Sequence, residues 1–151
     1  MSDCLRLIAL DEEDLAVISA NLQDSVIRIG DMAYLPRAKR FALVAARFDW
    51  VGAGGGCNER CQTGLHFERV LKVAHTGFDQ AAADTHLNLL SVMFQTADPP
   101  AGQVVLTFSG GAAVRLDVEC VEAQMRDLGP RWKAKAQPGH PLDDMQGSGA
   151  A

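Results

Sequence analysis

The segment QVVLTFSGGAAVRLDVE, residues 103–119, decides the fold. The Gly-Gly pair at 110–111 is typical of a two-residue hairpin turn, because both turn positions need a left-handed backbone that glycine adopts freely. After the turn, Val114, Leu116 and Val118 alternate with polar residues, which is the period of a strand with one buried face. The segment therefore predicts an antiparallel β-hairpin, and its neighbours extend the same pattern.

Most other segments between turns also have strand character. Their apolar residues alternate with polar ones, or form short runs bounded by glycine, proline or charged residues. In residues 40–50 the alternation changes face after Ala45, which predicts a β-bulge near Ala46 or Arg47. Apart from the hairpin, the predicted strands cover residues 4–10, 25–36, 40–50, 64–78 and 87–96.

The first helix is predicted over residues 12–23. Asp11 is the expected N-cap, because its side chain can accept a free backbone N–H, and the acids at 12–14 oppose the positive end of the helix dipole. Apolar residues then recur at i, i+3 and i+7 from Leu15, which places them on one helical face.

A second helix is predicted within residues 119–130. Val121, Met125 and Leu128 fit one helical face. The Gly-Pro pair at 129–130 is a typical helix stop, because glycine accepts the left-handed cap and proline cannot continue the helix.

This order of elements predicts an α+β fold. We expect an antiparallel sheet curled into a pleckstrin-homology-like barrel, with an N-terminal strand–helix extension and a C-terminal helix. An open antiparallel sheet with both helices on one face is the alternative. Residues 1–136 are expected to form a single globular domain, because 48% hydrophobic residues supply a core without disulfides or metal ions. Residues 137–151 have little to bury and are expected to be a disordered tail.

Composition excludes several classes of partner. The formal net charge of −5 does not favour nucleic-acid binding, which needs a basic face. No apolar run reaches the roughly 20 residues of a membrane-spanning helix. The N-terminal MSDCLRLIALDEED lacks the basic start of a signal peptide. We therefore expect a cytoplasmic protein with reduced cysteines that binds neither nucleic acid nor membrane.

The glycine-rich stretch DWVGAGGGCNERCQTG, residues 49–64, is predicted to be a long hairpin loop. Its glycines lead into a strand and not into a helix, so it is not a phosphate-binding loop. Cys57 and Cys61 are a candidate redox pair, because two thiols in a mobile loop can approach each other. Structural zinc normally needs four ligands, and a second cysteine pair is missing, so no metal or other cofactor is predicted.

No catalytic residue is predicted. The sequence has no Gly-x-Ser-x-Gly motif for a serine nucleophile. Cys61 and His66 are close in sequence, but no third residue that would orient them can be identified. The acids at 12–14 are explained by the start of the first helix, and Asp143 and Asp144 belong to the tail.

Two basic groups and one tryptophan are candidates for partner binding. The basic turn at 37–40 is explained either as a solvated hairpin tip or as part of a binding surface, and further basic residues follow the Gly-Pro pair. If the two groups converge, they form one basic patch for an acidic partner. Trp132 is a candidate partner anchor, because exposed tryptophans are enriched at interaction hot spots. The candidate patch consists of Arg37, Lys39, Arg40, Arg131 and Lys133.

Four stretches resemble one protein family. They are LIALDEEDLAVISANLQDSV at 7–26, YLPRAKRFALVAARFDW at 34–50, LHFERVLKV at 65–73 and VRLDVECVEAQMRDLGP at 114–130. Together they resemble the alphaproteobacterial family named domain of unknown function 2948, over roughly residues 5–132. The resemblance implies no activity and no catalytic residues, because the family has none assigned.

The expected function is that of a non-catalytic cytoplasmic barrel domain that binds a partner protein or forms a homo-oligomer. One alternative is a small-ligand-binding protein or an enzyme whose site assembles only in three dimensions. The other is a thiol redox or metal-responsive protein that uses Cys57 and Cys61.

Overall fold

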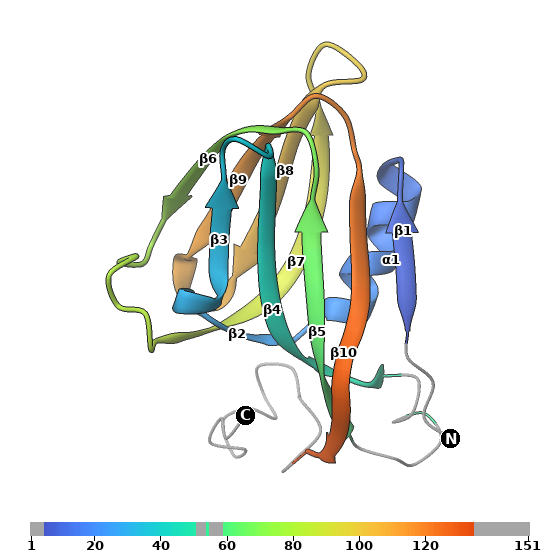
Figure 1. The fold of residues 1–151 in the computed structure, drawn as a ribbon, viewed down its shortest axis with the longest axis vertical. Coiled ribbons are helices and arrows are strands. Elements are labelled where there is room, and N and C mark those ends of the chain that lie inside the picture. The colour runs from blue at the N-terminus through green and yellow to red at the C-terminus, as the bar shows by residue number, and fades with distance from the viewer. Residues whose placement is uncertain (1–4, 51–53, 55–58, 135–151) are drawn as a thin grey trace.

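The structure, a computed structural model, describes residues 5–50, 54 and 59–134; the predicted tail at 137–151 lies outside them. Its main features are a ten-stranded antiparallel sheet and the helix α1 (Figure 1). The elements in chain order are β1 (Arg6–Ala9), α1 (Glu12–Leu22), β2 (Val26–Arg28), η1 (Ile29–Asp31), β3 (Met32–Leu35), β4 (Arg40–Phe48), β5 (Glu59–Phe67), β6 (Val70–Thr76), β7 (His86–Thr96), β8 (Gly102–Phe108), η2 (Ser109–Gly111), β9 (Ala113–Val118) and β10 (Ala123–Lys133).

The sheet curls but does not close. Its strands lie in the order β1-β10-β5-β4-β2-β7-β8-β9-β6, and β3 pairs with β4. Because β1 and β6 are the two ends of this order, the described strands form an open sheet that bends around its own core (Figure 1). The predicted α+β class with an antiparallel sheet is confirmed, whereas closure into a barrel is not.

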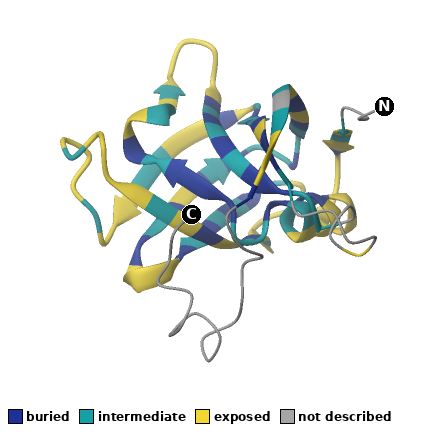
Figure 2. Ribbon diagram, turned by 90° about the horizontal axis from the view of Figure 1, so that it is seen from below, coloured by how far each residue is buried: buried dark blue, intermediate teal, exposed yellow. Residues whose placement is uncertain are grey.

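The hydrophobic core lies inside the curl of the sheet. Strands from both halves contribute to it, and Phe67 of β5 and Phe108 of β8 are among its fully buried side chains. Helix α1 adds Leu15, Ile18 and Leu22 and packs against β7 and β1. Buried and more exposed residues therefore alternate along the strands, which have one face on the core and one face outward (Figure 2).

The predicted hairpin and first helix are confirmed. Strands β8 and β9 pair around the Gly-Gly turn at 110–111, where φ is 78° and 85°. These left-handed values explain why the turn needs glycine. At the start of α1, the Asp11 side chain accepts a hydrogen bond of 2.8 Å from the backbone N–H of Asp14, as expected of an N-cap.

The prediction of a C-terminal helix is wrong, because residues 123–133 form strand β10 between β1 and β5. Burial there has a period of two: Ala123, Met125 and Asp127 face the core, and Leu128 is exposed. Met125 fits both the predicted helical face and the observed strand pattern. The alternation is hard to recognise in the sequence, because the buried residue that follows, Asp127, is charged. The Gly-Pro pair lies inside the strand, where the β10–β5 register shifts between residues 127 and 131.

The predicted bulge in β4 and the predicted extent of the glycine-rich loop are also wrong. The pairing of β4 with β5 keeps one register from Phe41 to Phe48, and Arg47 continues the core-facing side. The apparent change of face in the sequence is therefore explained by the buried charge of Arg47 and not by an extra residue. Strand β5 begins at Glu59, so Cys61 lies in a central strand, and residues 51–53 and 55–58 lie outside the described part.

Candidate ligand groove and buried charge cluster

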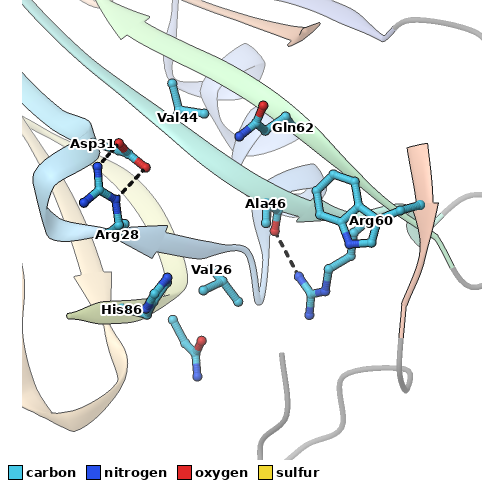
Figure 3. A pocket seen from close by; sticks show the side chains of 10 residues that line it. Val26, Arg28, Asp31, Val44, Ala46, Arg60, Gln62 and His86 are labelled. Carbon is cyan, nitrogen blue, oxygen red and sulfur yellow. Dashed lines mark hydrogen bonds and ion pairs between the residues drawn. The ribbon is translucent and has the colours of Figure 1, made fainter. Parts of the chain in front are cut away.

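A groove of about 620 Å³ lies on the outer face of the sheet, where β2 leaves β4 to pair with β7. Val26, Val44 and Ala46 line its middle (Figure 3). Val44 and Ala46 alternate with core-facing neighbours in β4, and Val26 precedes the core residue Ile27, so their small apolar side chains point away from the core. The volume falls within the range of about 300–1,000 Å³ typical of ligand sites.

One wall of the groove carries a paired arginine. Arg28 of β2 donates to Asp31 at 3.0 Å and to Asp84 at 2.9 Å (Figure 3 draws the Asp31 pair). The hydrogen bond and the charge of Asp31, together with Asp84, raise the pKa of Arg28. His86 and Asn88 of β7 lie on the same wall. Because Arg28 already pairs with two carboxylates, this wall offers no uncompensated arginine.

The opposite wall carries Arg60 and Gln62 from β5 and Trp132 from β10. Trp132 is directly opposite Arg60 in the β10–β5 register and is 44% exposed. Arg60 is only 5% exposed, and its Nη1 donates to the carbonyl oxygen of Ala46 at 2.9 Å (Figure 3). Burial lowers the pKa of Arg60, which the charge of Asp24 partly opposes.

The side chains of Phe48 and Trp50 form an aromatic pair beside Arg60. Its guanidinium carbon lies 5.7 Å from the ring centroid of Phe48, within the range of a cation–π contact. Trp50 meets Phe48 edge-on, with ring centroids 4.7 Å apart, and its indole N–H donates to the carbonyl of Gln23 at 2.9 Å. This packing fixes the guanidinium against the groove wall.

A second polar cluster is buried on the core side of the same strands. Arg47 of β4 donates to both carboxylate oxygens of Asp127 at 3.1 and 2.7 Å, and each side chain is 1% exposed. The same carboxylate accepts from the Thr63 hydroxyl at 2.7 Å and from the Leu5 backbone N–H at 3.0 Å. Burial alone would raise the pKa of Asp127, but these hydrogen bonds hold it below its usual value. The cluster is internally satisfied, so we interpret it as structural.

Of the predicted redox pair, Cys61 belongs to this buried cluster and Cys57 lies outside the described residues. The Cys61 thiol donates to the carbonyl of Gly129 at 3.4 Å, and burial raises its pKa. Burial therefore limits both the fraction of reactive thiolate and the access of reagents to Cys61. Within the described part of the chain, no group of three or more His, Cys, Asp or Glu residues is placed to hold a metal ion.

We predict that Cys61 reacts slowly with alkylating reagents in the folded protein. Cys120, which is partly exposed, is the internal control. Labelling with iodoacetamide followed by peptide mass spectrometry should show Cys120 modified at least about 10-fold faster than Cys61, because thiolate fraction and access set the rate. Equal rates in the folded protein would show that Cys61 is accessible and contradict its assignment to the core.

The two groups of candidate basic residues lie beside opposite ends of strand β4. Arg40 begins β4 beside the β3–β4 turn, whereas Lys133 of β10 pairs with Glu59, next to the end of β4. Several of these side chains also have acidic partners: Lys39 pairs with Glu119 and Arg40 with Glu68. Arg131 pairs with Asp49. The described fold therefore does not join the two groups into one patch, but it places Trp132 on the groove.

The family assignment follows from the chain as a whole. A model of the family described as Protein of unknown function (DUF2948) matches residues 5–140. The chain belongs to the DUF2948 family. No curated protein and no solved structure matches it. The match covers both walls of the groove and the buried cluster, and the DUF2948 description assigns no role to either. Among the described residues of this DUF2948 chain, no helix is long and apolar enough to cross a membrane.

Proposed function

We propose that this DUF2948 protein is a non-catalytic binding domain that holds a segment of a partner protein in the outer groove. The observation that carries the proposal is the half-exposed Trp132 beside the buried Arg60 on one groove wall. Tryptophan and arginine are the residues most enriched at binding hot spots, where they cluster in desolvated positions. The groove is also the place where five strands, β2, β4, β5, β7 and β10, bring side chains together.

The chemistry of the lining supports recognition of a peptide segment. The amides of Gln62 and Asn88 can donate to and accept from a peptide backbone, and Val26, Val44 and Ala46 offer a small apolar floor. The ionisable groups of the buried cluster, by contrast, bond to one another on the far side of the strands. On this proposal the domain acts in the cytoplasm, without nucleic acid or membrane, and uses its curled, pleckstrin-homology-like sheet as a scaffold.

Replacement of Trp132 with alanine should weaken partner binding by about 30-fold, the effect of a 2 kcal/mol hot spot. The assay selects random phage-displayed peptides on the wild-type protein and measures their affinities for both proteins by fluorescence anisotropy. The Leu35→Ala variant is the matched control, because Leu35 is similarly exposed but lies on β3, away from the groove.

The outcome separates a groove ligand from unspecific binding. Peptides that lose affinity for Trp132→Ala and keep it for Leu35→Ala support the proposal. If selection yields no peptide whose affinity depends on Trp132, the groove is not the binding site and the proposal fails.

A further inference from the structure

We propose that the groove selects an acidic side chain of the partner segment and that Arg60 binds its carboxylate. This inference rests on the proposed function, because it names the chemistry of the ligand for the same groove. It follows from a comparison between two arginines on neighbouring strands.

Arg47 and Arg60 are both nearly inaccessible to solvent, but their charges are compensated differently. Arg47 makes a two-bond ion pair with Asp127. Arg60 makes no ion pair with any carboxylate in the described part of the chain, although Asp24 is near enough to influence it. A buried charge without a hydrogen-bonded counter-ion is costly, so an arginine in this state favours an incoming anion.

The hydrogen bonds of Arg60 leave donors for such an anion. Nη1 donates to the carbonyls of Ala46 at 2.9 Å and, more weakly, of Asp24 at 3.4 Å. Nε is buried and has no hydrogen-bond partner among the described residues. A guanidinium has five N–H donors arranged to match the two oxygens of a carboxylate. A carboxylate in the groove would therefore compensate the charge of this guanidinium.

Within the described lining of the groove, the preference for an acidic side chain rests on Arg60. On the opposite wall Arg28 already pairs with Asp31 and Asp84, so it does not compete with Arg60 for a ligand carboxylate. Trp132 lies directly opposite Arg60 in the strand register and offers an apolar surface for a neighbouring side chain of the ligand. The expected ligand is an extended segment of a partner protein with Asp or Glu beside an apolar residue.

The test uses the Trp132-dependent peptides selected on the wild-type protein. These peptides should carry Asp or Glu, and exchange of that residue for Asn or Gln should weaken binding by about 10- to 100-fold, as expected for a hydrogen bond to a charged group. Once these peptides have been identified, the comparison uses only the wild-type protein, so it does not depend on the folding of any Arg60 variant.

Variants of Arg60 supply the second measurement. Arg60→Gln should bind acidic peptides and their amide counterparts with equal, low affinity. Arg60→Lys should recover only part of the preference, because lysine keeps the charge but loses the fork of donors. Arg37→Gln is the control for loss of a positive charge elsewhere, since Arg37 lies on the exposed β3–β4 turn. Thermal unfolding of each variant checks its fold.

The two proposals fail in different ways. If the selected peptides depend on Trp132 but contain no acidic residue, or if they bind Arg60→Gln as tightly as wild type, the groove binds peptides and the carboxylate inference is overturned. If no peptide depends on Trp132, the proposed function fails and the inference falls with it.

Discussion

Replacement of Asp127 with alanine is expected to lower the free energy of unfolding by about 3–5 kcal/mol. The substitution leaves the Arg47 guanidinium buried at 1% exposure without its counter-ion, and it removes the acceptor for the Thr63 hydroxyl. It also removes the acceptor for the Leu5 backbone N–H, which helps to hold the chain beside β1. The measurement is urea-induced unfolding followed by far-UV circular dichroism.

A double variant separates the cost of an unpaired charge from the value of the pair itself. In Arg47→Met with Asp127→Leu, neither charge of this pair remains, and apolar side chains of similar size fill the space. We expect this protein to recover the part of the stability that the unpaired charge costs, because the desolvation of an ion pair offsets much of its attraction. The loss of the acceptor for Thr63 and Leu5 remains. If Asp127→Ala costs less than about 1 kcal/mol, the pair is not buried as the structure places it.

The pH dependence of stability provides a second readout of the same pair. Hydrogen bonds hold the pKa of Asp127 below its usual value in the folded protein. The unfolded chain therefore takes up this proton first, and the stabilisation is complete above the unfolded pKa of about 3.9. It is lost as the pH falls through the lower folded pKa. Wild type should consequently lose more stability than the double variant below about pH 4.

The structural features that were predicted correctly depend on neighbouring residues. The Gly-Gly hairpin and the Asp11 cap each involve atoms within a few positions of one another, so their signals are contained in short segments. The α+β class follows from the same local patterns, because a succession of hairpin-linked strands favours an antiparallel sheet. Such features need no knowledge of distant contacts.

The features that were missed depend on distant partners. Arg47 and Asp127 are 80 positions apart, and either charge alone argues against a buried strand position. Without the pair, β4 is interpreted as bulged and β10 as a helix. The candidate site is predicted in part: the sequence indicates Trp132 as an anchor but does not single out Arg60 as a binding residue. Its importance arises from the register that places it against Phe48 and Trp132, which the sequence does not reveal.

The second substitution that is expected to destabilise the protein strongly is Gly102→Ala in the β7–β8 hairpin. Gly102 begins β8 and pairs with Thr96 of β7. A Cβ atom at this position would lie 2.3 Å from the carbonyl oxygen of Gln95 and 2.6 Å from the ring of Phe94. The first of these atoms belongs to the backbone of the paired strand, so relief of the clash requires the two strands to separate. Gly102→Ala is therefore expected to destabilise the protein by about 2–3 kcal/mol, as overpacking does.

Gly129→Ala is the matched control for this substitution. Gly129 also lies in a strand, but a Cβ atom there would meet nothing closer than the Cβ of Gln62 at 4.0 Å. The expected change in the free energy of unfolding is within about 0.5 kcal/mol, as for an uncrowded surface site. Both variants are compared with wild type by their urea midpoints. Equal midpoints for the two variants would show that β7 and β8 tolerate a side chain at position 102. That result would contradict the close approach of the Gln95 carbonyl in the structure.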